Sequence, residues 1–194
     1  MDKNTRYSTE IIEPKNKNVT ILKENVTDEK IKYFNPKYVK QQIKKIEKAR
    51  DQVLIQFLFY TGLRITEAIR LKKLDLDFEN NMAKVHHLKR NKINKRKIPI
   101  KSELMMILKL YTTKLNQKDK LFPISRQHGY RIVKKHLGGS PHMLRHTFAI
   151  NYLNKGGQVV KLSRLLGHKS VRTTMVYLDI TPVDLQVELE KLDL

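Results

Sequence analysis

Residues 140–148 read Ser-Pro-His-Met-Leu-Arg-His-Thr-Phe, and the organisation of the chain can be worked out from this segment. A helix is predicted to begin here, because Pro141 suits a first helical turn and Ser140 before it is a favoured N-cap. His142 and Arg145 are three residues apart, so they share one face of that helix near its positive end. A phosphate bound there would meet free backbone N–H groups, an imidazole and a guanidinium.

Two more chemical groups follow this segment along the chain. Leu166-Gly167-His168 places a second imidazole at a corner between helices, and Tyr177 comes nine residues later. Cations gathered around a phosphodiester, with a phenol nearby, suit an attack on nucleic acid. Taken singly, each residue has an ordinary alternative: Arg145 as a solvated charge, His168 as packing for a helix corner and Tyr177 as a core residue. His146 is expected to face the core or to support the site.

The composition narrows the class of partner. The 194 residues include 40 Lys and Arg against 19 Asp and Glu, a formal net charge of +21. Such a field favours a polyanion, double-stranded DNA first, although a ribosomal protein would show the same excess. No apolar run approaches the ~20 residues of a membrane-spanning helix, so no membrane partner is expected. The absence of cysteine excludes disulfides and zinc–cysteine sites and fits a cytoplasmic, DNA-associated protein.

The first third of the chain is predicted to hold an arm followed by helices. Residues 1–34 are polar and lack a clear period, so they are interpreted as an arm or linker with a short strand at 19–22. From Asn35 and Pro36 apolar residues recur at three- and four-residue steps as far as residue 58, which predicts one continuous helix ended by Gly62. Another short helix is predicted from Arg64.

Residues 74–100 change to the alternation typical of strands. Strands are predicted at 74–78, 83–88 and 97–100, and the basic run 89–96 is predicted to be a hairpin turn. Further helices are predicted at 102–115, at 125–137, from residue 141 to a break at 156–157, up to residue 166, at 170–177 and at 182–192. The predicted fold is therefore mainly α with a small antiparallel β-sheet.

Several motifs occur together in chain order: Thr61-Gly-Leu-Arg64-Ile-Thr-Glu67, a lysine at the hairpin, His142-Met-Leu-Arg145-His-Thr-Phe, Leu166-Gly-His168 and Tyr177. This set resembles the catalytic domain of the tyrosine recombinases, the integrase family of enzymes that break and rejoin DNA. The resemblance covers residues 35–194 and implies a tyrosine recombinase catalytic domain ending in a C-terminal assembly helix. Most members carry a further core-binding domain, so the chain resembles either an excised catalytic domain or a naturally short recombinase.

The resemblance also implies roles for the motif residues. Tyr177 would attack a backbone phosphate and form a 3′-phosphotyrosyl enzyme; a phenol, with a pKa of about 10, needs a proton acceptor or a cationic field to do so. Arg64 and Arg145 would hold the non-bridging oxygens, where the fork of a guanidinium fits best. His142 would relay protons or orient the phosphate, as general base in one direction and general acid in the other, and His168 would donate to the scissile phosphate.

A lysine would protonate the leaving 5′-oxygen. The glycines that often surround it in the family are missing here, but Leu88-Lys89 resembles the strand end of compact members, which favours Lys89 with Lys92 as the alternative. The same basic run would contact DNA through Lys92, Lys95 and Arg96. Glu67 would be a supporting carboxylate that fixes an arginine or histidine.

The implied activity is site-specific recombination of double-stranded DNA by a tetramer on two DNA sites, with accessory DNA-binding proteins as further partners. Neither a metal nor another cofactor is expected, because the phosphotyrosyl ester conserves the energy of the broken bond. Two alternatives remain open: relaxation of supercoils like that of a type IB topoisomerase, and DNA binding without cleavage on the same fold.

Overall fold

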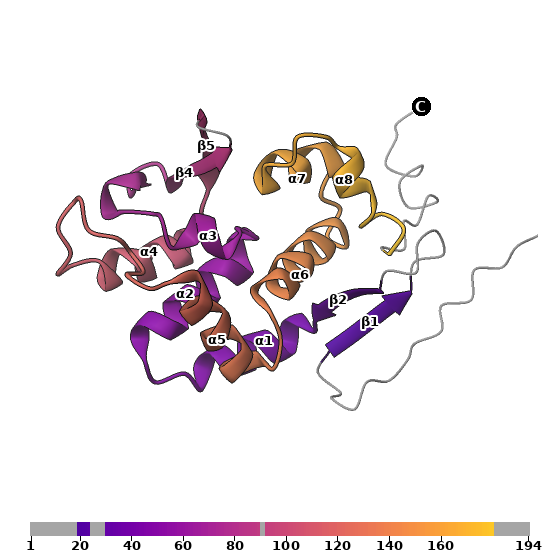
Figure 1. Ribbon diagram of the computed structural model, residues 1–194, viewed down its shortest axis with the longest axis horizontal. Coiled ribbons are helices and arrows are strands. Elements are labelled where there is room, and N and C mark those ends of the chain that lie inside the picture. Colours follow the sequence, from indigo (N-terminus) through magenta and orange to yellow (C-terminus); the bar gives the residue numbers. More distant parts are fainter. Residues whose placement is uncertain (1–18, 24–29, 90–91, 181–194) are drawn as a thin grey trace, which may run out of the picture.

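The computed structural model describes residues 19–23, 30–89 and 92–180, with side chains described at 31–86 and 95–180 (Figure 1). The elements run in the order β1 (Val19–Lys23), β2 (Lys30–Phe34), α1 (Pro36–Lys44), α2 (Ala49–Thr61), α3 (Ile65–Ala68), a 3₁₀ turn η1 (Lys73–Asp75), β3 (Leu76–Asp77), β4 (Met82–Lys89), β5 (Lys92–Pro99), α4 (Ser102–Tyr111), α5 (Arg126–Leu137), α6 (Pro141–Leu153), α7 (Val159–Leu166) and α8 (Arg172–Met175). The predicted fold class, mainly α with a small antiparallel sheet, is confirmed.

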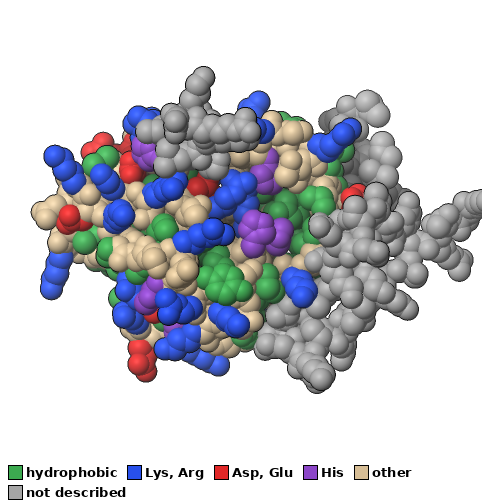
Figure 2. Space-filling model, in the orientation of Figure 1, with side chains coloured by type: hydrophobic (Ala, Val, Ile, Leu, Met, Phe, Trp, Pro, Cys, Tyr) green, Lys and Arg blue, Asp and Glu red, His purple; other side chains and the backbone are tan. Residues whose placement is uncertain are grey.

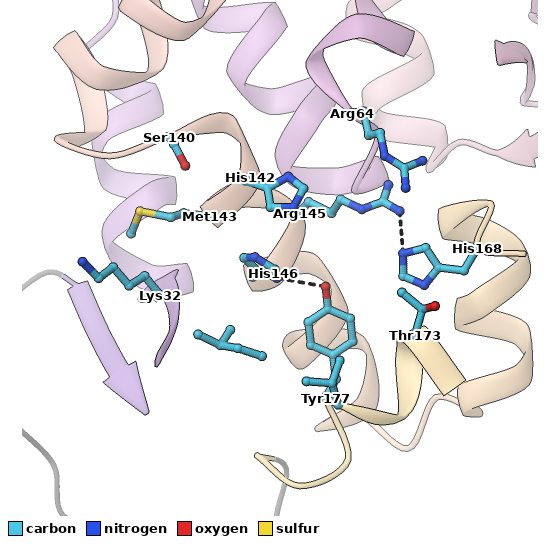
Figure 3. Close-up of a pocket in the computed structure, with 12 residues that line it drawn as sticks. Lys32, Arg64, Ser140, His142, Met143, Arg145, His146, His168, Thr173 and Tyr177 are labelled. Atoms are coloured by element: carbon cyan, nitrogen blue, oxygen red, sulfur yellow. Dashed lines mark hydrogen bonds between the residues drawn. The ribbon is translucent and has the colours of Figure 1, made fainter. Parts of the chain in front are cut away.

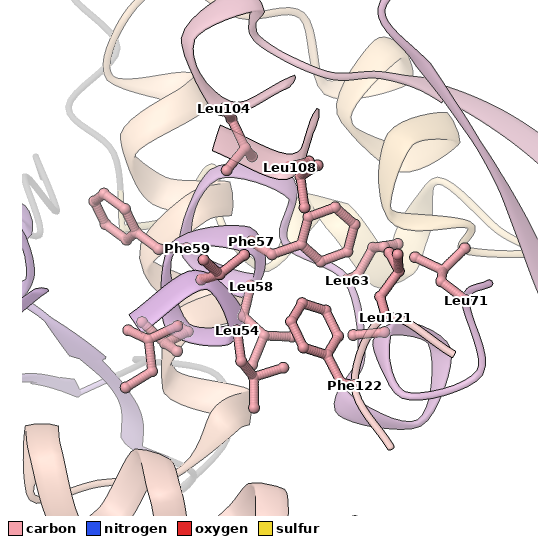
Figure 4. Packing of buried hydrophobic residues seen from close by; sticks show 14 of the residues in the cluster. Leu54, Phe57, Leu58, Phe59, Leu63, Leu71, Leu104, Leu108, Leu121 and Phe122 are labelled. Carbon is pink, nitrogen blue, oxygen red and sulfur yellow. The ribbon is translucent and has the colours of Figure 1, made fainter. Parts of the chain in front are cut away.

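Helix α2 forms the centre of the larger of two hydrophobic clusters. Its residues Leu54, Phe57 and Leu58 are fully buried, and the rings of Phe57 and Phe122 lie 6.0 Å apart (Figure 4). A helix that is apolar on nearly all faces is one that other elements enclose, and α2 packs against α4 and α6. The larger cluster extends from Phe34 and α1 through α5 and the β3–β4–β5 sheet to the first turn of α6.

The smaller cluster lies on the other side of α6. It consists of one residue from β2, three from the second half of α6, two from α7 and a tyrosine after α8: Ile31, Ala149, Ile150, Leu153, Leu162, Leu166 and Tyr177. Helix α6 therefore belongs to both clusters and lies between α2 and the pair α7 and α8 (Figure 1). Side chains along α6 can therefore contact residues of either cluster.

The three-stranded sheet corrects the predicted hairpin turn. Strands β4 and β5 are antiparallel, and Lys89 pairs directly with Lys92. Residues 92–96 of the predicted turn are thus strand, because cross-strand pairing continues to the end of both segments. The turn prediction was too long because a basic run carries no apolar alternation from which a strand could be recognised.

The N-terminal segment contains a hairpin that the polar composition did not reveal. The strand predicted at 19–22 is confirmed as β1, and it pairs with β2, which was not predicted. Phe34 at the end of β2 is fully buried, and its N–H donates to the Thr147 hydroxyl at 2.8 Å. Strand β2 is therefore attached to α6, although it precedes the predicted domain boundary at residue 35.

Two helix predictions need correction. The single helix predicted between Pro36 and Gly62 is broken at residues 45–48, where no glycine or proline marks the break. Tertiary packing places Ile46, buried in the break, in the larger cluster. The helix predicted at 170–177 is only α8 (Arg172–Met175), so Tyr177 follows it in a turn. The predicted helix 182–192 lies outside the described residues.

Helix α4 ends at Tyr111, before the predicted residue 115, and α6 ends at Leu153, before the predicted break at 156–157. Several other helix ends agree with the sequence. Asn35 caps α1, Ser125 caps α5, and α6 begins at Pro141 after Ser140. Gly62 ends α2 with a left-handed backbone, at φ +63°, a conformation in which glycine carries no Cβ penalty. Within the described residues, no helix has both the length and the apolarity to cross a membrane.

Candidate active site

A pocket of about 630 Å³ opens where the two clusters meet along α6 (Figure 3). It collects side chains from four parts of the fold: β2, the start of α3, α6, and the segment that follows α7. The lining residues are Ile31, Lys32, Arg64, Ser140, His142, Met143, Arg145, His146, His168, Thr173, Val176 and Tyr177. The predicted residues Arg64, His142, Arg145, His168 and Tyr177 are therefore brought together.

Arg145 is almost fully enclosed, with 2% of its surface exposed. Its Nη1 donates to the Gly62 carbonyl at the end of α2, and its Nη2 donates to the Leu166 carbonyl at the end of α7, both at 2.8 Å. Helix C-termini carry partial negative charge, so both carbonyls suit a cation. Burial, followed by the charge of Arg64, lowers the pKa of Arg145 to about 10, and the group stays charged at neutral pH.

Arg64 and Glu67 are fixed together at the start of α3. Glu67 is 2% exposed, and its Oε2 accepts from the Arg64 backbone N–H at 2.9 Å, as in a capping box. The buried Nη1 of Arg64 lies 3.8 Å from Glu67 Oε1, which is too far for a hydrogen bond. Because this Nη1 has no hydrogen-bond partner among the described residues, it can donate to an anion in the pocket.

Arg96 of β5 is placed differently from the prediction that it contacts DNA. Its Nη1 donates to Glu67 Oε1 at 2.8 Å, and its other nitrogens donate to the carbonyls of Leu165 and Leu166 at 3.3 and 3.4 Å. A Cβ at Gly167 would lie 2.6 Å from Arg96 Nη1, so a larger residue there would displace the guanidinium, and its φ of +67° also favours glycine. Arg96 therefore connects the larger cluster to α7, and its contact with DNA stays a prediction.

The pKa of Glu67 follows from these contacts. Burial alone would raise it, but the hydrogen bond and charge of Arg96, with the Arg64 backbone bond, lower it below the ordinary value. Glu67 is thus ionised at neutral pH and holds two arginines in place. The predicted supporting position of this carboxylate agrees with the geometry, while its second partner, Arg96, was missed because 29 residues separate them.

His168 makes two contacts that define its tautomer. Its Nε2 lies 2.9 Å from Arg145 Nη2, and its Nδ1 lies 2.7 Å from the buried Thr174 hydroxyl. A guanidinium only donates, so Nε2 accepts and Nδ1 carries the proton. Burial, followed by the charges of Arg145 and Arg64, lowers the pKa of His168 to about 4. The predicted donation to a phosphate therefore requires His168 to leave Arg145 or to gain a second proton.

Tyr177 is buried at the junction with the smaller cluster, with 3% of its surface exposed, and its hydroxyl faces the pocket (Figure 3). The hydroxyl lies 2.9 Å from Nδ1 of His146. His142, one turn earlier on α6, is more exposed, and its ring stands edge-on to that of His146 at 4.9 Å between centroids. Burial, followed by Arg145 and Arg64, lowers the pKa of His142.

The structure describes the side chains of only some of the candidate lysines. Lys89 and Lys92 face each other at the end of the β4–β5 hairpin, but their side chains lie outside the described part of the structure. Lys95 is exposed on β5. Lys32 on β2 is an exposed residue of the pocket wall that the sequence analysis assigned to the arm. Alternation along a short polar strand was its only sequence signal.

The pocket has the electrostatics of an anion site. Lys and Arg side chains cover much of the face seen in Figure 2, acidic ones are few, and histidines lie near its centre. The described residues contain no group of three or more His, Asp or Glu that could hold a metal ion. Guanidiniums in a partly enclosed pocket bind a phosphate through charge-assisted bonds that are stronger there than in open water.

Comparisons with known proteins place this pocket in context. The model of the phage integrase family matches residues 32–182. The chain is 32% identical over 169 residues to the tyrosine recombinase XerA of Saccharolobus solfataricus, covering 84% of this chain and 57% of that protein. It is 31% identical to XerA of Pyrococcus horikoshii, covering 87% of this chain and 68% of that protein. The chain thus spans little more than half of the first relative.

Solved structures show the same fold. The crystal structure of a XerA recombinase superposes with a TM-score of 0.64 at 26% identity, over 81% of this chain and 61% of that one. The catalytic domain of bacteriophage HP1 integrase superposes with a TM-score of 0.64 at 22% identity, over 82% of this chain and 94% of that one. A Tn1549 transposon integrase, solved with circular intermediate DNA, has a TM-score of 0.62 at 25% identity, over 82% of this chain and 65% of that one.

Proposed function

The chain belongs to the phage integrase family, and on this premise we propose that it is a site-specific recombinase that breaks and rejoins double-stranded DNA through Tyr177. One observation carries the proposal: two arginines, three histidines and a tyrosine from separate parts of the sequence line one pocket. The names of the relatives, and the DNA present in the transposon integrase structure, support it.

In the proposed reaction a backbone phosphate lies between Arg64 and Arg145. The oxygen of Tyr177 bonds to phosphorus as the bond to the 5′-oxygen breaks, leaving a 3′-phosphotyrosyl ester and a 5′-hydroxyl. The guanidiniums offset the negative charge that develops on the non-bridging oxygens. The ester keeps the energy of the broken bond, so a 5′-hydroxyl can attack it and restore the strand. Lys89, or Lys92 in its place, would supply the proton to the leaving oxygen.

Binding beyond the scissile phosphate would use exposed lysines on either side of the pocket. Lys32 of β2 lines the pocket and Lys95 is exposed on β5, and each would contact a phosphate of the bound DNA. Each phosphate contact adds to the salt dependence of binding without adding sequence specificity. We further propose a tetramer on two DNA sites, with the segment after Ile180 contributing to contacts between copies, and a location with the DNA in the cytoplasm.

A nicked duplex that traps the cleaved product tests the proposal. The probe is DNA from the region flanking the protein's own gene, nicked near the candidate site so that the freed strand diffuses away. Wild-type protein should become covalently attached to DNA, and Tyr177→Phe should not. Tyr111→Phe is the matched control, because it removes a hydroxyl that bonds to the Leu121 carbonyl outside the pocket. An adduct that persists in Tyr177→Phe would refute the assignment.

A second assay separates recombination from simple relaxation. Supercoiled plasmids carrying two copies of the trapped site should yield recombinant circles or inverted segments. Relaxed plasmid without recombinant product would favour the topoisomerase-like alternative. Binding without any adduct on the nicked duplex would favour a non-cutting DNA-binding protein.

A further inference from the structure

The hydroxyl of Tyr177 is directed at His146 and not at His142. Its oxygen lies 2.9 Å from His146 Nδ1, and the two rings are 5.7 Å apart between centroids (Figure 3). His142 and His146 are four residues apart on α6, so they lie on one face with His146 deeper in the pocket. His142 stands at the more exposed rim, where it reaches a neighbouring hollow with Arg64, Arg126 and Tyr130.

His146 can accept a proton at Nδ1 as the neutral tautomer that carries its hydrogen on Nε2, the form in which the Tyr177 hydroxyl donates to Nδ1. Burial, followed by the charges of His142, Arg145 and His168, lowers its pKa to about 4, so the ring is neutral at neutral pH. The charged and titratable groups around it are His142 and Arg145 on α6, His168 after α7, Lys32 on β2 and Tyr177 itself. A bound phosphate would bring negative charge among these cations, which raises the basicity of the imidazole when it is needed.

We propose that His146 is the catalytic base that takes the Tyr177 proton during DNA cleavage. This inference rests on the proposed function. As the Tyr177 oxygen bonds to phosphorus, its proton moves to Nδ1 of His146, and the bond from phosphorus to the 5′-oxygen breaks with protonation by the hairpin lysine. In the reverse direction His146 returns the proton to the tyrosine as the 5′-hydroxyl attacks. His142 is left free to bind the phosphate at the rim.

Matched substitutions of His146 and His142, one turn apart on α6, test which of the two histidines takes the tyrosine proton. His146→Asn keeps a polar group near the position of Nδ1 but cannot take up a proton, and His142→Asn makes the same change at the rim. Single-turnover attachment to the nicked duplex is measured from pH 5 to pH 10. General acid–base residues accelerate reactions by about 10²–10⁴-fold, so His146→Asn should slow covalent attachment by that factor. The attachment rate of this variant should rise with pH, because the Tyr177 phenolate then forms without a base. His142→Asn should keep the wild-type pH profile.

A second substrate assigns the loss to the tyrosine side of the reaction. A 5′-bridging phosphorothiolate has a thiolate as its leaving group, which departs without an acid because thiols are far stronger acids than alcohols. His146→Asn should stay slow on this substrate, whereas Lys89→Ala should recover. Recovery of His146→Asn would instead place the residue beside the leaving group and overturn the proposal.

Other outcomes also decide the question. A His146→Asn variant with the wild-type rate, or with a slow rate and an unchanged pH profile, would overturn proton transfer to His146. His146→Gln is the second variant should His146→Asn fail to fold, as judged by its thermal midpoint and DNA affinity. If wild-type protein forms no adduct, the proposed function itself fails; if only the histidine results differ, this inference alone fails.

Discussion

The two hydrophobic clusters contribute different chemistry to the pocket. The larger cluster, built around α2, adjoins Arg64, which can bind an anion, and Glu67, which accepts from the Arg64 backbone N–H. The smaller cluster is built from β2, α7 and the second half of α6. It includes Tyr177, and His168 lies next to it in the pocket wall, just after α7. The candidate nucleophile and part of the anion site thus belong to separately packed bodies, which must stay in register for a reaction to occur.

Two arginines connect these bodies. Arg145 bonds to Gly62 of the larger cluster and to Leu166 of the smaller one. Arg96 bonds to Glu67 on one side and to the end of α7 on the other. The charged side chains at this pocket therefore have a structural role as well as a chemical one. The same side chains hold the two clusters together and position the site.

Removal of Arg145 should break the connection most severely. Arg145→Met removes the 2.8 Å donors of the Gly62 and Leu166 carbonyls and leaves Leu166 only the longer bond from Arg96, at about 1–3 kcal/mol for each buried group. We expect the free energy of unfolding in urea to fall by about 3–5 kcal/mol, together with loss of DNA cleavage. Arg126→Met, at an exposed arginine, is the control and should change stability by less than about 0.5 kcal/mol. An Arg145→Met protein as stable as the control would disprove the connecting role.

Arg96 and Lys95 are neighbours on β5, and substitutions at the two positions should distinguish an effect on stability from an effect on DNA binding. Arg96→Met leaves Glu67 with a buried charge and should lower the free energy of unfolding by about 2–4 kcal/mol. The logarithmic salt dependence of DNA binding should keep its slope. Lys95→Gln should do the reverse, with unchanged stability and a slope reduced by about 1. A salt slope that falls in Arg96→Met would show that Arg96 contacts DNA as well as Glu67.

Acid should loosen the smaller cluster first, with the smallest of the three effects. His146 and His168 have pKa values of about 4 in the fold against an ordinary value of 6.5. Between pH 6.5 and pH 4 the unfolded chain therefore binds protons that the folded chain refuses, so stability falls as the pH falls. We expect a loss of about 1–3 kcal/mol after solvent screening.

Hydrogen exchange measured at pH 7 and pH 5 would locate that loss. Amides of α7 should lose protection before those of α2, because both histidines contact residues of the smaller body, Tyr177 and Thr174. A His146→Phe, His168→Gln double variant should show a flatter pH dependence. Equal loss of protection in both helices would mean that the two clusters unfold as one unit.

Much of the site was predictable because its signals are local. The N-cap and proline before His142, the glycine before His168 and the glycine–leucine turn before Arg64 each act within one helical turn. Those rules placed Arg64, His142 and His168 near helix ends, and the family resemblance connected them with Arg145 and Tyr177. The hidden features were Lys32 on an unremarkable strand and the internal position of Arg96, since neither has a local signature.

The sequence by itself determined the helix boundaries at Gly62, Ser140 and Gly167, and the spacing that puts His142 and His146 on one face of α6. The tertiary structure decided which of the two meets Tyr177, 31 residues beyond His146, and joined Phe34 to Thr147 across 113 residues. Capping and helical period depend on neighbours along the chain, whereas these pairs depend on how α6 packs between two clusters. That packing is a property of the whole set of buried side chains and is written in no single segment.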